Sequence, residues 1–167
     1  MELNDHLQDN ILYLAELLIC RKITISAAES CTGGLIAKMI TDVPGSSRYF
    51  KGSAVTYCNE AKENILSVKH SALLTYTAVS EEVAKEMAMG SQNIYHSDLA
   101  VSITGYAGPG NGERGESPGL VYIGISGWQG VYVFKENFVG SRDNIRKQAV
   151  HKSVSYTHLT LPTTERV

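Results

Sequence analysis

A serine at a sharp turn is the first residue of this sequence that could do chemistry. Ser30 lies in the run Ala-Glu-Ser-Cys-Thr-Gly-Gly at residues 28–34, between an alternating stretch at 23–28 and an apolar stretch at 35–40. The first stretch predicts a strand and the second predicts a helix. A hydroxyl at such a turn is exposed at the edge of a sheet and could act as a nucleophile, but Ser30 or Thr32 could instead only cap the helix. Both interpretations stay open at this point.

The backbone after Ser30 could supply positive potential. The first N–H groups of a helix have no partner within it, so Thr32, Gly33 and Gly34 could bind an anion or stabilise a developing oxyanion. Cys31 is the rival nucleophile, although no basic residue near it in the sequence favours a thiolate. The commoner role of such a cysteine is that of a small buried hydrophobic residue.

A serine hydroxyl is a weak nucleophile until a base accepts its proton. None of the five histidines lies in a recognisable nucleophile-elbow or triad setting. A lysine can replace histidine when burial or nearby cations lower its pKa. Lys62 follows a second predicted strand, 53–58, and lies at the border of the apolar face of a predicted helix, 60–66, so it could point back toward the strand end. The alternative is an ordinary lysine in water.

Two later segments could hold a ligand. The glycine-rich loop 105–119 contains GxGxxG spacing, but Pro118 and another strand follow it, which excludes a dinucleotide fold. Such a loop can still supply backbone donors and a mobile rim. Arg142 and Arg146 share one face of a helix that Ser141 could cap, and this pair suits one phosphate group. A solvated basic face is the alternative interpretation.

The order of elements predicts the fold class. The predicted elements are a helix over 3–21, strands over 23–28, 53–58, 98–104, 120–126 and 131–138, and helices over 35–40, over 60–66, from 81 and from 141. Helices interleaved with about five strands predict a three-layer α/β/α sandwich with a mixed, mostly parallel sheet. Ligands on such sheets lie beyond the carboxyl ends of strands, which is where the loops discussed above begin.

Composition excludes several classes of function. The chain has 167 residues, 43% hydrophobic residues and a net charge of -2, which predicts one globular domain and argues against direct nucleic-acid binding. No stretch is long and apolar enough to span a membrane, so a cytoplasmic protein is expected. The three cysteines have neither disulfide-framework nor zinc spacing, and the histidines form no HxH or HExxH pair. Neither a metal nor another cofactor is expected.

The last fifteen residues do not follow the helical period. Residues 153–167 are rich in threonine, and Pro162 lies where a helix would have to stop. We therefore expect the domain to cover 1–152, the final helix to end near Ser153, and 153–167 to be an extension, an expression remnant or a sequencing artefact.

Several segments together resemble the CinA C-terminal domain family. They are 28–35 (AESCTGGL), 43–47 (VPGSS), 55–62 (VTYCNEAK), 78–80 (AVS), 103–109 (ITGYAGP) and 142–146 (RDNIR). Members are nicotinamide mononucleotide deamidases of bacterial pyridine salvage, also labelled competence/damage-inducible proteins. The resemblance implies a three-layer α/β/α fold, a homo-oligomer, and metal-free hydrolysis of a carboxamide to nicotinic acid mononucleotide and ammonia.

The resemblance also implies roles for residues. Ser30 would be the nucleophile, and Tyr57 and Lys62 would activate its hydroxyl. The substrate-binding residues would be Thr32, Gly33, Gly34, Ser46, Thr104, Gly105, Arg142 and Arg146, with Arg142 near the nucleotide phosphate. Two alternatives stay open: a Cys31-dependent hydrolase, and a non-catalytic module that binds a nucleotide or a protein partner in competence or the DNA damage response.

Overall fold

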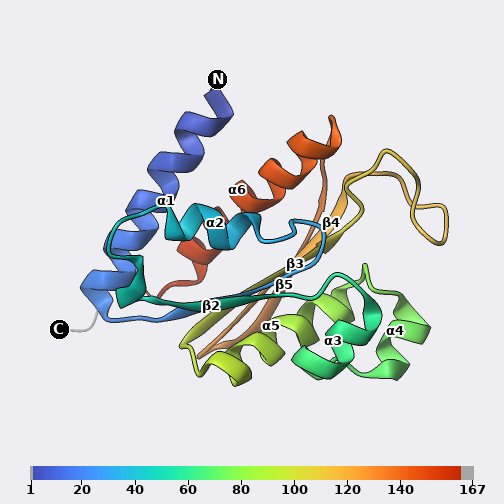
Figure 1. Ribbon diagram of the computed structural model, residues 1–167, viewed down its shortest axis with the longest axis horizontal. Helices are drawn as coiled ribbons and strands as arrows, with labels where there is room; N and C mark the ends of the chain where they lie inside the picture. Colours follow the sequence, from blue (N-terminus) through green and yellow to red (C-terminus); the bar gives the residue numbers. More distant parts are fainter. Residues whose placement is uncertain (1, 163–167) are drawn as a thin grey trace.

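The computed structural model describes residues 2–162, and side chains from His6 onward (Figure 1). Its centre is a five-stranded sheet with strand order β2-β1-β3-β4-β5. The strands are β1 (Ile25–Glu29), β2 (Phe50–Val55), β3 (Leu99–Gly105), β4 (Leu120–Gly127) and β5 (Gly130–Asn137). The pairs β1–β2 and β1–β3 are parallel, whereas β3–β4 and β4–β5 are antiparallel. Only β4 therefore runs against the other strands, which confirms a mixed, mostly parallel sheet.

Helices cover both faces of the sheet. The helices are α1 (Glu2–Arg21), α2 (Leu35–Thr41), α3 (Asn59–Leu66), α4 (His70–Tyr76), α5 (Glu81–Tyr95) and α6 (Arg142–Thr160), with a 3₁₀ turn, η1, at Ser46–Arg48. In Figure 1, α1, α2 and α6 lie above the sheet and α3, α4 and α5 lie below it. The predicted three-layer sandwich is confirmed.

The core is built from apolar stripes and from two central strands. Leu7, Ile11, Leu14 and Leu18 are buried along one face of α1, as the helical period predicts. All five residues of β1 are buried, because β1 lies between β2 and β3 and is covered on both faces. The end of β1 is therefore a rigid place from which to present a side chain.

The register brings the functional loops to one edge of the sheet. Glu29 pairs with Val55 on one side and with Ile103 on the other, so β1, β2 and β3 end together. Leu120, at the start of β4, pairs with Asn137 at the end of β5, which brings the start of α6 to the same edge. Four segments far apart in the sequence thus meet there.

One local prediction is wrong, and one helix was missed. The second strand covers 50–55 rather than 53–58, because its bounds follow its pairing with β1, and the last ladder bond runs from the Thr56 N–H to the Glu29 carbonyl. Tyr57 and Cys58 then leave the sheet to begin α3. The short helix α4, at His70–Tyr76, was not predicted.

The predicted end of the last helix near Ser153 is also wrong. Helix α6 continues to Thr160, and the expected boundary at 152 falls inside it. Ser153, Val154 and Thr157 are buried there, and the Thr157 hydroxyl donates to the Ser153 carbonyl. Burial of these side chains thus offsets the low helix propensity of threonine. Residues 163–167 of the expected tail lie outside the described part of the chain.

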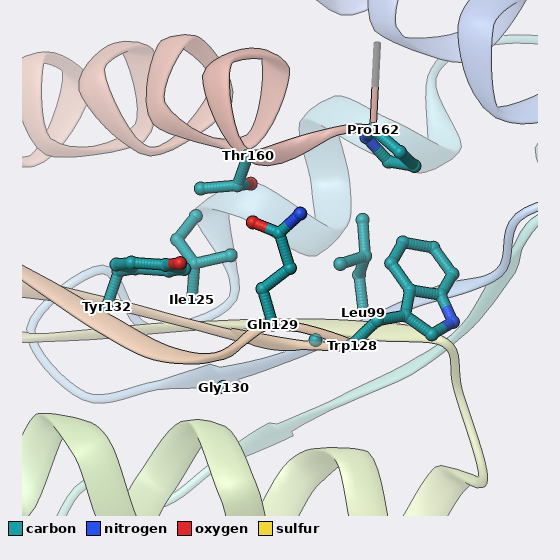
Figure 2. A pocket seen from close by; sticks show the side chains of 9 residues that line it. Leu99, Ile125, Trp128, Gln129, Gly130, Tyr132, Thr160 and Pro162 are labelled. Carbon is teal, nitrogen blue, oxygen red and sulfur yellow. The ribbon is translucent and has the colours of Figure 1, made fainter. Parts of the chain in front are cut away.

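A small apolar pocket lies at the β4–β5 hairpin, at the opposite end of the sheet from the edge where β1, β2 and β3 end. Figure 2 shows Trp128 and Tyr132 on the hairpin facing Thr160 and Pro162 at the end of α6. The cavity measures about 100 Å³. Trp128 is 56% exposed, as expected for a residue at a hairpin tip.

Candidate active site

Ser30 and Lys62 lie together at the carboxyl edge of the sheet. The Lys62 Nζ is 3.0 Å from the Ser30 Oγ and donates a second hydrogen bond of 2.6 Å to the Thr56 carbonyl. Lys62 is 1% exposed and Ser30 is 9% exposed. A nucleophile and a base within hydrogen-bond reach are the basic requirement for activating a hydroxyl.

Lys62 is placed by the short connection between β2 and α3. Cys58 is the N-cap of α3, and Lys62 lies one turn later on the same buried face as Leu66. Burial lowers the Lys62 pKa from 10.5 to about 8, and the Cys58 and Cys31 thiols oppose this only in part. A substantial fraction of the lysine is therefore neutral near physiological pH, and only the neutral amine can accept a proton.

The turn that carries Ser30 is held from within by Glu29. The Glu29 carboxylate accepts hydrogen bonds from the Ile36 and Ala37 N–H groups at the start of α2. The Gly33 N–H donates to the Ser30 carbonyl. Of the three N–H groups expected to bind an anion, those of Thr32, Gly33 and Gly34, the Gly33 N–H is therefore already occupied by a main-chain carbonyl of the turn.

A cavity of about 310 Å³ opens beside Ser30 and Lys62. It is lined by Ser30, Cys31, Tyr57, Asn59, Lys62, Ala78, Val79, Thr104, Gly105, Tyr106, Ala107, Gly108, Gly110, Glu113 and Arg142. Thr104 and Gly105 are thus among the lining residues, and the Thr104 hydroxyl donates to the Ala78 carbonyl. The cavity combines a buried serine–lysine pair with a cationic rim at Arg142.

Tyr57 lies on the rim of this cavity. It is 62% exposed, and its hydroxyl accepts a 3.1 Å hydrogen bond from the Arg142 Nη2. Arg142 also donates to the Gly108 carbonyl at 2.6 Å. In the described part of the chain, the Tyr57 hydroxyl is therefore hydrogen-bonded to Arg142 and not to Ser30 or Lys62.

Several predicted substrate-binding residues do not line the cavity. Arg146 donates to the Cys31 carbonyl at 3.1 Å and to the Thr32 carbonyl at 2.8 Å, so it secures the turn rather than pointing into the cavity. The Thr32 side chain is buried against Glu29. Gly33 and Gly34 shape the turn, with φ of 58° and 102°. Ser46 is buried in η1, outside the lining.

Cys31 lines the cavity but is a poor nucleophile. Burial raises its pKa to about 12, against the opposing effects of Arg146 and Lys62. The thiol is therefore protonated at neutral pH, which argues against a Cys31-dependent hydrolase.

Sequence reasoning missed some residues of the site. Tyr106 and Glu113 of the glycine-rich loop line the cavity, and the carbonyl of Thr56 orients Lys62. A main-chain carbonyl leaves no signal in a side-chain pattern. Position 113 lies in a loop whose path depends on long-range contacts, such as the bond from Arg114 to the Thr75 carbonyl.

In the described residues, no three His, Cys, Asp or Glu side chains gather into a group that could hold a metal ion. Across residues 2–162, no helix combines the length and the apolar character needed to span a bilayer.

Comparison with known proteins identifies the family. The family model described as "CinA C-terminal domain" matches residues 8–161. The chain belongs to this family. The match includes the segment 153–161, which was expected to lie outside the domain.

Relatives with related names share about half of the aligned residues. A CinA-like protein of Endomicrobium trichonymphae is 51% identical over 138 residues, which are 83% of this chain and 32% of the relative. A CinA-like protein of Syntrophomonas wolfei is 50% identical over 141 residues, 83% of this chain and 34% of the relative. The chain thus spans about a third of the length of these curated relatives.

Solved structures share the CinA fold. A competence or damage-inducible protein from Enterobacter asburiae superposes with a TM-score of 0.91 at 29% identity, covering 93% of this chain and 98% of that one. A competence-damaged protein (CinA) superfamily protein from Escherichia coli gives 0.90 at 32% identity, covering 93% and 90%.

Proposed function

We propose that this chain is a serine amidohydrolase that converts nicotinamide mononucleotide to nicotinic acid mononucleotide and ammonia. The observation that carries the proposal is the 3.0 Å contact between the Ser30 Oγ and a buried Lys62 amine whose pKa is lowered to about 8. Membership of the CinA C-terminal domain family and the resemblance of 28–35, 55–62 and 103–109 to its deamidases supply the substrate.

In the proposed reaction the Ser30 Oγ attacks the amide carbon while its proton passes to neutral Lys62. The resulting Lys62 ammonium lies beside the developing negative charge and stabilises it. The carbon–nitrogen bond then breaks, and Lys62 returns the proton to the leaving amide nitrogen, which departs as ammonia. Water, deprotonated by Lys62, hydrolyses the acyl-enzyme and restores Ser30.

Proton transfer is direct in this scheme. Tyr57 bonds to Arg142 at the rim, whereas Lys62 contacts Ser30 itself, so no relay through the phenol is needed. Arg142 lies in the first turn of α6, where the helix dipole adds to its charge. We assign it the substrate phosphate, and Tyr57 a role in orienting the guanidinium.

The test is ammonia release from nicotinamide, its riboside and its mononucleotide. Ser30→Ala should lower kcat for the mononucleotide by about 10⁴-fold or more, whereas Ser47→Ala, at an exposed serine of η1, should match wild type. A Ser30→Ala protein that keeps more than about a tenth of the wild-type rate would exclude the serine mechanism. Binding of the mononucleotide without ammonia release by wild type would favour the non-catalytic alternative.

Substrate anchoring needs a separate measurement. Arg142→Ala should raise KM for the mononucleotide by about tenfold or more while changing kinetics on the riboside little, because the riboside lacks the phosphate. Equal losses on both substrates would count against the assigned role of Arg142.

A further inference from the structure

The Glu29 side chain lies directly beneath the turn that carries Ser30. It is 0% exposed, and none of the ion pairs among residues 2–162 includes it. Burying a carboxylate is costly unless hydrogen bonds satisfy its oxygens. An acidic residue in such a place is expected to have a structural or mechanistic reason.

Both carboxylate oxygens of Glu29 are satisfied by neutral donors. Oε1 accepts from the Thr32 hydroxyl at 2.9 Å and the Ile36 N–H at 3.0 Å. Oε2 accepts from the Ser53 hydroxyl at 2.8 Å and the Ala37 N–H at 3.3 Å. One side chain therefore joins β1, β2, the turn and the first turn of α2.

The backbone that these bonds constrain is intrinsically loose. Gly33 and Gly34 both have positive φ, and glycine restricts the chain less than any other residue. Ser30 immediately follows Glu29, and its Oγ must stay about 3 Å from the Lys62 Nζ for proton transfer. A misplacement of about 1 Å at a reacting group can cost about 100-fold in rate.

We propose that Glu29 is a positioning residue for the nucleophile: by gathering the N–H groups of α2 and the Thr32 hydroxyl, its carboxylate holds the turn in the shape that directs Ser30 at Lys62. The inference rests on the proposed function of Ser30 as the nucleophile. It assigns to Glu29 an effect on kcat that acts through Ser30, without contact with the substrate.

Conservative variants separate this role from charge. Glu29→Gln keeps one oxygen for Thr32 and Ile36, and the Ser53 hydroxyl can turn to accept from the new NH2 group. Only the Ala37 N–H then loses its acceptor. Glu29→Asp keeps a carboxylate, but it is shorter by one methylene, so its oxygens fall short of the α2 donors. Positioning therefore predicts that Gln rescues and Asp does not.

The experiment measures two rates on the folded variants: kcat for ammonia release, and the rate of Ser30 labelling by a fluorophosphonate probe. Glu29→Ala and Glu29→Asp should lower both by about 100-fold with KM changed little, and Glu29→Gln should stay within about tenfold of wild type. The labelling rate does not require nicotinamide mononucleotide to be the substrate. A wild type that is labelled but releases no ammonia would therefore refute the proposed substrate and still test Glu29.

A matched pair keeps the test sharp if Glu29→Ala does not fold. Thr32→Val and Ser53→Ala each remove one hydroxyl donor from Glu29, the first within the turn and the second on β2. Thr32→Val should lower both rates by about tenfold, whereas Ser53→Ala should leave them within about twofold of wild type. The proposal is overturned if Glu29→Asp matches wild type while Glu29→Gln does not, if labelling is unchanged in Glu29→Ala, or if Thr32→Val and Ser53→Ala lower both rates equally.

Discussion

Replacing Lys62 by methionine tests the state of the buried amine without any assumption about the substrate. Lys62 is 1% exposed, and its pKa falls to about 8, whereas a lysine in the unfolded chain titrates near 10.5. Between these two values the unfolded state binds more protons than the folded state. Wild-type stability should therefore rise with pH across this window, relative to a variant that lacks the amine.

The expected size follows from the same two pKa values. At pH 7 the buried lysine lowers the free energy of unfolding by about 3 kcal/mol, because each unit of difference between the folded and unfolded pKa is worth about 1.4 kcal/mol. At pH 10 the unfolded lysine is itself partly neutral, and the cost falls below about 1 kcal/mol. The free energy of unfolding of wild type should thus gain roughly 2 kcal/mol on that of Lys62→Met between pH 7 and pH 10.

The measurement is urea unfolding followed by circular dichroism at several pH values for both proteins. Loss of the bonds to Ser30 and Thr56 changes the offset between the two curves but not its pH dependence. Lys51→Met, at an exposed position of β2, is the matched control and should run parallel to wild type. If the difference in free energy of unfolding between wild type and Lys62→Met stays constant from pH 7 to pH 10, the Lys62 pKa is not lowered. That result would refute the mechanism in which Lys62 acts as the base.

Three further outcomes follow from the site. The pH profile of kcat should rise with pH and level off above about 8, because only neutral Lys62 can accept the serine proton. Lowering the Lys62 pKa from 10.5 to about 8 raises the neutral fraction at pH 7 by about 300-fold. A profile that falls over this range would contradict a lysine base. Arg146→Ala should lower kcat and lower the free energy of unfolding by about 1–3 kcal/mol, because Arg146 donates to two main-chain carbonyls of the turn. A rise in KM confined to the mononucleotide would instead indicate that Arg146 binds the phosphate. Cys31→Ala should keep kcat within about threefold of wild type, and thiol alkylation should not change the rate, because the thiol is protonated; loss of activity in both experiments would revive the cysteine mechanism.

The placement of Ser30 and Lys62 at the same edge of the sheet follows from features that are visible in the sequence. A strand-to-helix turn after β1 and a second one after β2 place both residues beyond the ends of adjacent parallel strands. Lys62 lies four residues before the apolar Leu66, and both are buried on one face of α3. Parallel topology is therefore enough to bring both residues to one edge of the sheet. The sequence left open whether Lys62 lies in water, and only the packing of α3 in the folded protein buries it.

The separate roles of the two arginines do not follow from spacing alone. Arg142 and Arg146 share a helical face, but four residues of helix advance about 6 Å along its axis. In the folded protein Arg142 lines the cavity, whereas Arg146 donates to the carbonyls of Cys31 and Thr32. Only the docking of α6 against α2 decides which arginine reaches which partner.

The burial of Glu29 could not be predicted from the residues around it in the sequence either. A glutamate at the end of an apolar strand predicts the polar boundary of that strand, yet its partners include Ser53, which lies 24 residues away. The same limit applies to α6, where threonine content predicts an early end and burial of Val154 and Thr157 against the core overrides it. Long-range packing decides both cases.

The proposed roles of Glu29 and Lys62 are compatible only if the two side chains do not pair. In the described residues, the groups that act on the Lys62 pKa besides burial are the Cys58 and Cys31 thiols, and no carboxylate is among them. A carboxylate beside the amine would favour the ammonium form and raise its pKa, which would remove the base. The donors of α2, Thr32 and Ser53 hold the Glu29 oxygens instead. The turn can thus be fixed by a strong acceptor while Lys62 stays without an acidic partner, and Ser30 lies between the two.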